Sequence, residues 1–226
     1  MTLLRKRFQS NFQEPISILD KGIPLKMYTG LNLSIENSNL DGLNLTEPEI
    51  CQNYITSVLQ TNNAEVAYGG YLENRSLYSD KVGFMGIGET QRTIHLGIDF
   101  WTKAGTTVLV PFTGIVHSFK NNNIRGDYGP TIILEHEIAG LRFHTLYGHL
   151  SIKSLQNLKT GQSFETEAVL GTIGSQEVNG NYAPHLHFQI IIDMNDWSGD
   201  YPGVCAKSDI SHYSDNCPDP NLLLNL

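Results

Sequence analysis

The sequence has little of several features that mark particular protein classes. Its 226 residues include only three cysteines, Cys51, Cys205 and Cys217, which are too few and too scattered for a disulfide framework. A single bridge between Cys205 and Cys217 stays possible. No apolar run approaches the ~20 residues that a membrane-spanning helix needs. We therefore expect neither a disulfide-stabilised scaffold nor a transmembrane segment.

Basic side chains are also scarce. The chain carries 15 lysines and arginines against 23 aspartates and glutamates, which gives a formal net charge of −8. A general nucleic-acid binder needs many cationic contacts to phosphate, so this balance argues against nucleic acid as a partner. With 40% hydrophobic and 17% charged residues, the composition is that of a globular protein with one large domain, or one domain with an appendage.

The start of the chain lacks the pattern of a secretory signal peptide. A basic cluster, Arg5 to Arg7, is followed by Gln9, Ser10 and Asn11, where a signal peptide would have ~7–15 apolar residues. We therefore expect a cytoplasmic protein on the sequence as given. A periplasmic or secreted protein would be expected if a leader had been trimmed away.

The chain divides into three parts by composition. Residues 1–80 are rich in asparagine, serine and leucine and are expected to form an N-terminal extension that packs on the core. One helix is predicted there, because Thr46 to Glu49 combine capping residues with a proline in the first turn. Apolar residues then recur at helical spacing up to Asn62 and Asn63. Residues 81–193 are expected to form the main domain, and residues 194–226 a C-terminal tail that wraps the sheet.

The main domain reads as a mainly β, antiparallel sheet. Short apolar runs with glycine and proline between them predict strands, and no long helical pattern separates them. Glycine-, asparagine- and tyrosine-rich stretches at 126–130 and 178–182 predict loops. The predicted strands are 107–111, 114–119, 131–136, 142–147 and 187–192.

Histidine is the informative residue type. His185 and His187 are two residues apart, so in a strand both imidazoles lie on one face of the sheet. The residues between and after them, Leu186 and Phe188, are apolar and continue as a core-facing row. The histidine face is therefore expected to carry the function.

A second pair combines an imidazole with a carboxylate. His95 and Asp99 would be ~13 Å apart in a straight strand, which is too far to share one ion. Gly97 lies between them, where a bend or bulge would bring both side chains inward. Imidazole and carboxylate are ordinary Zn²⁺ ligands, and three protein ligands with an open fourth position are typical of a catalytic site.

Each pair alone is a weak signal, because chance predicts roughly 0.3 His-x-His pairs and roughly 0.4 His-x3-Asp pairs in this composition. Further motifs follow in unbroken order, and together with the two pairs they form a specific signal. Over about residues 93–192 the chain resembles the LytM/lysostaphin-type zinc metallopeptidase domain, family M23. The motifs that carry the resemblance are His-x3-Asp at 95–99, Tyr-Gly-His-Leu at 147–150, Lys-Thr-Gly-Gln at 159–162, Leu-Gly-Thr-Ile-Gly at 170–174 and Pro-His-Leu-His-Phe at 184–188.

The resemblance implies a role for each of five residues. It implies that His95, Asp99 and His187 bind the zinc ion, and that His149 and His185 are the catalytic histidines that do not bind it. All five positions are filled, which argues against the degenerate family members that lack turnover. Strand alternation in 143–149 predicts that His149 faces the site with residues 143, 145 and 147, while His144 faces away. We interpret His144, His117, His136 and His212 as structural.

The resemblance further implies a zinc-dependent endopeptidase that cleaves peptide bonds between small residues, most often in bacterial peptidoglycan cross-links. Two other functions stay open at this stage. One is a metal-containing LytM module that binds or regulates without hydrolysis. The other is an intracellular hydrolase of small peptides or amides. No Gly-x-Ser-x-Gly motif and no cysteine nucleophile motif competes with the metal site.

Overall fold

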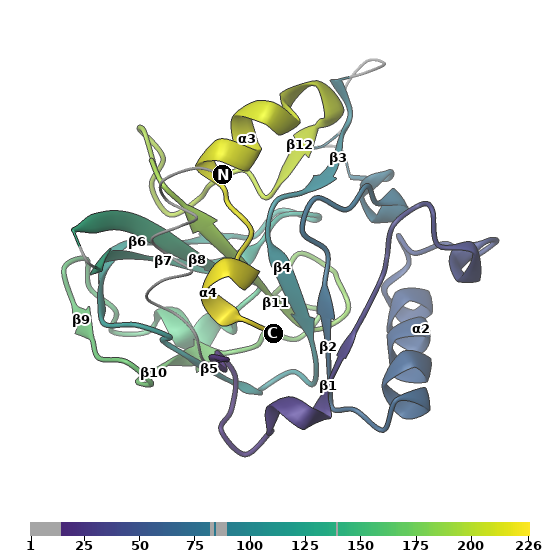
Figure 1. Cartoon of the computed structure of the whole chain (residues 1–226), viewed down its shortest axis with the longest axis horizontal. Helices are drawn as coiled ribbons and strands as arrows, with labels where there is room; N and C mark the ends of the chain where they lie inside the picture. The colour runs from purple at the N-terminus through teal and green to yellow at the C-terminus, as the bar shows by residue number, and fades with distance from the viewer. Residues whose placement is uncertain (1–14, 82–83, 85–89, 139) are drawn as a thin grey trace.

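The computed structural model describes residues 15–81, 84, 90–138 and 140–226 (Figure 1). The basic cluster at Arg5 to Arg7 lies outside the described residues. The strands are β1 (Tyr28–Gly30), β2 (Val66–Gly69), β3 (Arg92–His95), β4 (Ile98–Trp101), β5 (Thr107–Leu109), β6 (Gly114–Asn122), β7 (Gly129–Ile138), β8 (Leu141–Gly148), β9 (Ser163–Phe164), β10 (Val169–Thr172), β11 (His185–Ile191) and β12 (Val204–Ala206). The α-helices are α2 (Pro48–Thr61), α3 (Ile210–Asn216) and α4 (Asn221–Leu224).

One large sheet organises the molecule. Its eight strands lie in the order β1-β2-β4-β11-β8-β7-β6-β9, and two smaller two-stranded sheets, β10-β5 and β12-β3, flank it. The pairs within the large sheet are antiparallel except β1 with β2, which is parallel. The prediction of a mainly β fold is confirmed. The sheet is nevertheless mixed, because a long helical connection lets β1 and β2 run in the same direction.

The alternation predicted for β11 is confirmed. Leu186, Phe188 and Ile190 are fully buried on the core face, and His185 and His187 lie on the other face. β11 is a central strand, since β4 pairs with it on one side and β8 on the other. The two histidines are therefore held by ladder hydrogen bonds on both sides, which fixes their direction.

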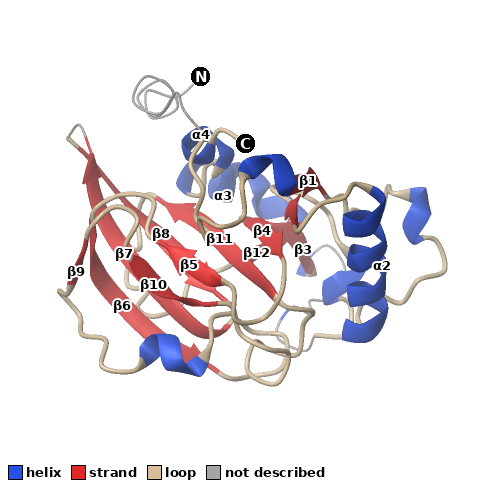
Figure 2. Ribbon diagram, turned by 90° about the horizontal axis from the view of Figure 1, so that it is seen from below, coloured by secondary structure: helices blue, strands red, loops and turns tan. Residues whose placement is uncertain are grey.

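Helix α2 is the predicted N-terminal helix, and it lies beside β1 and β2 at one end of the sheet (Figures 1 and 2). It buries Cys51 and Ile55 in a cluster that also contains Trp101 of β4. The predicted cap is wrong in detail: Glu47 holds the N-cap position without a side-chain hydrogen bond, and the Thr46 hydroxyl bonds to Asn44 instead. The end of the helix at Asn62 agrees with the prediction.

The C-terminal part is ordered and packs on the sheet, with Leu223 and Leu224 of α4 fully buried. Strand β12 pairs with β3, the strand that ends at His95. All three cysteines are buried and free, so Cys205 and Cys217 are not bridged. None of the helices in the described part of the chain is long and apolar enough to cross a membrane.

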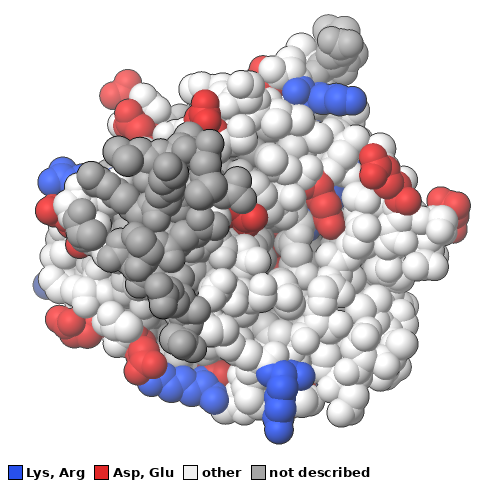
Figure 3. All heavy atoms as spheres, viewed as in Figure 1, with Lys and Arg blue, Asp and Glu red and all other residues white. Residues whose placement is uncertain are grey.

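The surface agrees with the acidic composition. Figure 3 shows acidic and basic side chains as separate small groups on one face, with no continuous basic area among its described residues. The described part of this face therefore offers no broad cationic surface of the kind that a phosphate backbone would require.

Candidate metal centre and active site

Three side chains predicted as ligands converge at the middle of the sheet. Strand β3 ends at His95, the chain bends at Leu96 and Gly97, and β4 begins at Ile98 and carries Asp99. Asp99 lies directly opposite His187 in the β4–β11 pairing. The bend brings His95 Nε2 to 3.2 Å from Asp99 Oδ1, far closer than a straight strand would allow.

Gly97 makes this bend sterically possible. A Cβ atom at this position would lie 2.6 Å from the Phe188 carbonyl oxygen and 2.7 Å from His187 Cε1.

We expect Gly97→Ala to displace the His187 ring, to lower stability by ~1–3 kcal/mol, as overpacking does, and to weaken zinc binding. Thermal unfolding and zinc content check this. Gly30→Ala, where a Cβ would meet nothing within 4 Å, is the matched control. Wild-type stability and zinc content in Gly97→Ala would contradict the expectation.

The hydrogen bonds of the two histidines show which nitrogens face the centre. His95 Nδ1 lies 2.9 Å from the Gly70 carbonyl oxygen, which can only accept, so Nδ1 carries the proton and Nε2 a lone pair. His187 Nε2 donates to Gln189 Oε1 at 2.9 Å, and the Gln189 amide donates in turn to the Pro202 carbonyl. His187 Nδ1 is therefore the second nitrogen with a lone pair.

The resulting donor set fits a cation. His95 Nε2 and His187 Nδ1 are 2.9 Å apart, and His187 Nδ1 is 3.1 Å from Asp99 Oδ1. Two nitrogen lone pairs and a carboxylate oxygen at these separations repel one another unless a proton or a metal ion lies between them. Zn²⁺ bound tetrahedrally at ~2.0–2.1 Å would place its ligand atoms about 3.3 Å apart, close to the observed distances. His95, Asp99 and His187 thus form a candidate zinc site.

Charge and burial favour the ligand-competent forms. All three side chains are almost completely buried. Burial lowers the pKa of His95 to about 4, which keeps its imidazole neutral at physiological pH. Burial alone would raise the pKa of the Asp99 carboxyl, but His95 and the Arg75 guanidinium outweigh it and hold that pKa well below its usual value. His95 is therefore a neutral imidazole and Asp99 a carboxylate, the forms in which these side chains bind zinc.

His149 reaches the site by a route that strand alternation did not predict. In the β8–β11 pairing Tyr147 lies opposite Phe188 on the core face, and Gly148 lies opposite His187 on the site face. The parity argument was therefore wrong, since it placed His149 on the face of residues 143, 145 and 147. Strand β8 instead ends at Gly148, and His149 has φ +60°, a left-handed turn that directs its ring into the site.

Backbone carbonyls fix the orientation of His149 and His185. His149 Nδ1 donates to the Asn179 carbonyl and His185 Nδ1 to the Ala183 carbonyl, each at 2.8 Å. The Nε2 atoms are left free, and His185 Nε2 lies 3.9 Å from Asp99 Oδ1. The ring centroids of the two histidines are 4.1 Å apart. Burial lowers the pKa of His185 to about 4 and that of His149 well below its ordinary value, so both are neutral at physiological pH.

The remaining histidines of the sheet lie elsewhere. His136 uses both ring nitrogens, bonding to the Thr113 carbonyl and the Thr145 hydroxyl, and it is not among the residues that line the cavity at the metal site. The prediction that His144 faces away from the site is wrong, because His144 shares the sheet face of His187. It nevertheless pairs with Ile191, four residues further along β11, and its Nε2 lies 3.5 Å from Glu135. His117 packs against His144. These positions agree with a structural interpretation.

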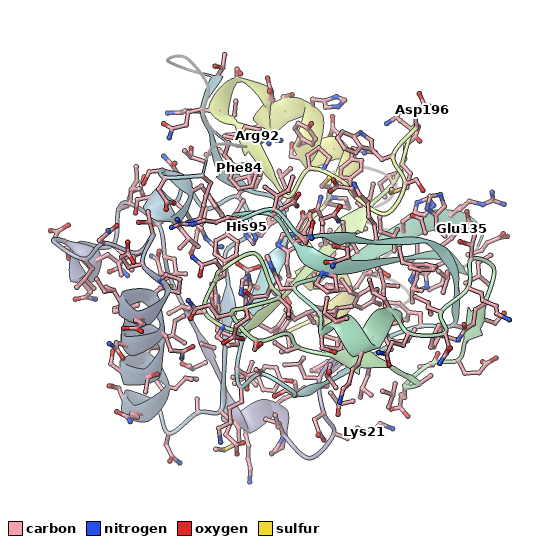
Figure 4. All side chains as sticks on the ribbon, turned by 180° about the vertical axis from the view of Figure 1, so that it is seen from behind. Lys21, Phe84, Arg92, His95, Glu135 and Asp196 are labelled. Atoms are coloured by element: carbon pink, nitrogen blue, oxygen red, sulfur yellow. The ribbon has the colours of Figure 1, made fainter. Side chains whose placement is uncertain are left out.

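A cavity of about 210 Å³ opens onto the metal site. Its walls include Tyr78, Phe84 and Arg92 on one side and the loop at 197–204 on another. Figure 4 shows His95 in the interior with Phe84 and Arg92 near it, whereas Lys21 and Glu135 lie well away. The cavity is smaller than the ~300–1,000 Å³ of common ligand sites.

Sequence reasoning missed the contribution of the N-terminal part. Gly70 and Arg75 contact the ligands directly, through the hydrogen bond from His95 and through an ion pair with Asp99. A single glycine and a single arginine in an asparagine- and serine-rich stretch form no recognisable motif. Gln189 follows His187 at the same two-residue spacing, but its partnership with His187 emerges only from the structure.

The family comparison agrees with this site. Residues 93–198 match the profile described as Peptidase family M23. A zinc-containing peptidase from Vibrio cholerae is 27% identical, with a TM-score of 0.35, over 43% of this chain and 27% of its own. The catalytic domain of the antimicrobial peptidase lysostaphin from Staphylococcus simulans is 24% identical, with a TM-score of 0.39, over 69% of this chain and 96% of its own. A comparison with curated proteins found no match.

Proposed function

We propose a function from the premise that this chain belongs to peptidase family M23 through residues 93–198. The proposed function is that of a zinc-dependent endopeptidase that cleaves peptide bonds between small residues. Its proposed substrate is the cross-links of bacterial peptidoglycan. The observation that carries the proposal is the convergence of His95, Asp99 and His187, whose ligand atoms lie 2.9–3.2 Å apart. Two further histidines with free Nε2 atoms adjoin this centre.

The ligand arrangement suits catalysis. Three protein ligands leave the fourth position of a tetrahedral ion open, and a zinc ion there would supply a Lewis acid and an activated water nucleophile. The three outer contacts, from Gly70, Arg75 and Gln189, hold the ligand atoms in place before the metal binds. The near-complete burial of the ligands keeps bulk water away and strengthens electrostatic interactions within the site.

His149 and His185 are proposed to move the protons. Their neutral Nε2 atoms can accept a proton from the water that attacks the scissile carbonyl. The same proton then goes to the leaving nitrogen as the C–N bond breaks, which yields a carboxylic acid and an amine; transfer of the acid's proton to the amine gives a carboxylate and an ammonium group. The resulting imidazolium can also donate a hydrogen bond to the developing oxyanion. Trp101 stacks on His185 at a centroid distance of 4.0 Å, which holds the ring in one orientation.

The cavity supports the proposed preference for small residues. Its volume is only about 210 Å³, and aromatic side chains such as Tyr78, Tyr182 and Tyr201 line it. A chain of glycine or alanine residues could enter, whereas bulky side chains next to the scissile bond would meet these rings. The same small volume favours a second candidate, a hydrolase of small peptides or amides.

Zinc-loaded protein incubated with purified peptidoglycan should release fragments with new amino termini, which mass spectrometry identifies. The His187→Ala variant serves as the control without a complete metal site. A panel of short glycine- and alanine-containing peptides, tested in parallel, separates the two candidates. Hydrolysis of short peptides without release from peptidoglycan would favour the second. Binding to peptidoglycan with no hydrolysis of any substrate, at one zinc per chain, would contradict both.

A further inference from the structure

A short segment outside the family match runs alongside the metal site. Residues 70–75 follow β2 and pair with β3 through the hydrogen bonds Leu72 N to His95 O, His95 N to Glu73 O and Arg75 N to Thr93 O, at 2.8–2.9 Å. The backbone on both sides of the ligand His95 is thereby fixed to this segment. Residues 70–75 and the ligand His95 are therefore held side by side by backbone hydrogen bonds.

The segment places a buried arginine on a metal ligand. The Arg75 side chain is 1% exposed, and its Nη1 lies 2.5 Å from Asp99 Oδ2. Its Nε bonds to Glu73 Oε2 at 2.8 Å, and Nη1 also donates to the Tyr78 hydroxyl at 3.2 Å. A buried guanidinium is stable only when its charge is compensated and its N–H groups are bonded, and here two carboxylates meet that need.

Gly70 makes room for the guanidinium. Gly70 has φ +107°, and a Cβ there would lie 1.8 Å from Arg75 Nη2 and 3.0 Å from His95 Nδ1. The same residue supplies the carbonyl that accepts from His95. The absence of a side chain at residue 70 thus lets one segment support two ligands, His95 through its carbonyl and Asp99 through Arg75.

The effect of Arg75 on metal binding has two opposed parts. A cation next to a ligand carboxylate repels a metal ion that shares the carboxylate. Glu73 offsets this repulsion, because its carboxylate bonds to the other side of the same guanidinium. What remains is geometric: Arg75 occupies Oδ2 of Asp99 and leaves Oδ1 toward the two imidazoles, at 3.1 and 3.2 Å.

We propose that Arg75 is a positioning residue for the metal centre, which makes Asp99 bind through Oδ1 alone and so keeps the fourth coordination position free for the reaction. The inference rests on the proposed zinc site. It assigns a functional role to residues 70–75, which precede the family match at residue 93.

Full-length Arg75→Met tests the proposal, because methionine fills much of the same volume without donors. Zinc affinity is measured by competition with a chelator, and coordination by the visible absorption of the cobalt-substituted protein. We expect a 10–100-fold loss of metal affinity or of kcat/KM. Weaker cobalt absorption should accompany this loss, because a bidentate Asp99 raises the coordination number above four. Arg75→Lys should recover part of both, since its ammonium can still donate to Oδ2. Arg142→Met, at an exposed arginine of β8, is the matched control.

The outcomes separate this inference from the proposed function. Wild-type metal affinity and cobalt absorption in Arg75→Met, even with a lower melting temperature, would show that Arg75 only stabilises the fold and would overturn the inference. If Arg75→Met does not fold, Glu73→Gln decides, because the guanidinium then loses the carboxylate that holds its Nε. Metal affinity and cobalt absorption both equal to those of wild type would overturn the inference. A wild-type protein that binds no metal would overturn the zinc site and this inference together.

Discussion

Replacing His187 by alanine should remove most of the zinc from the protein. His187 Nδ1 is one of three ligand atoms, and the remaining pair, His95 Nε2 and Asp99 Oδ1, cannot hold the ion at comparable strength. Loss of an outer partner alone costs about 10–100-fold in affinity, so loss of a ligand should exceed that range. The metal content of wild type and variant after dialysis against a weak chelator measures the effect, with one zinc per chain expected for wild type.

His95→Ala should behave in the same way, because its Nε2 lies only 2.9 Å from His187 Nδ1 and serves the same ion. His144→Ala is the matched control. His144 is a mostly buried histidine on the same sheet face, but it contacts Glu135 and His117 rather than the ligands. It should keep its zinc and any activity. Wild-type zinc content in both ligand variants would show that the metal assignment is wrong, whereas zinc loss in His144→Ala would indicate a general loss of structure.

The convergence of these side chains could be predicted because its signal is local, whereas the roles of ligand and catalytic histidine came only from the resemblance to family M23. His185 and His187 follow from the two-residue period of a strand, and the buried row of Leu186 and Phe188 confirms it. His95 and Asp99 follow from four-residue spacing with Gly97 between them, and the chain does bend there. In each case, spacing along a single short segment was enough to bring the side chains together.

His149 shows where that reasoning fails. Alternation holds only while a strand continues, and the left-handed φ of His149 ends it one residue after Gly148. Nothing in the letters Tyr-Gly-His-Leu fixes the residue at which the turn begins. The hydrogen bond from His149 N to the Tyr128 carbonyl, which accompanies the turn, comes from a residue 21 positions earlier in the chain.

Pairing between segments far apart in the sequence accounts for the other differences between the predicted and the observed structure. Strands β1 and β2 extend the sheet from a region that composition marked only as an extension, and their parallel pairing depends on the crossover through α2. Arg75 lies 24 residues before its partner Asp99, and this contact exists only because residues 70–75 pair with β3. Short-range periodicity contains no information on such contacts.

Removing His149 or His185 should leave zinc in place and greatly slow hydrolysis. Both rings adjoin the centre, yet each directs a free Nε2 toward it while Nδ1 is held by a backbone carbonyl. Neither histidine belongs to the proposed set of three metal ligands, His95, Asp99 and His187. General acid–base help contributes ~10²–10⁴-fold, and an oxyanion donor ~10²–10³-fold, so each alanine variant should lose kcat/KM within these ranges.

The losses of kcat/KM in the two single variants should not multiply in the double variant. The ring centroids are 4.1 Å apart, so both histidines act on one transition state, and the double variant should lose less than the product of the single losses. The measurement is kcat/KM together with bound zinc for His149→Ala, His185→Ala and the pair, on a confirmed substrate. Zinc loss in either single variant would show that this histidine is a metal ligand and that the ligand set His95, Asp99 and His187 is wrong. Full activity in both single variants would mean that the proton leaves the attacking water by another route, because no other free imidazole among the described residues lines this cavity.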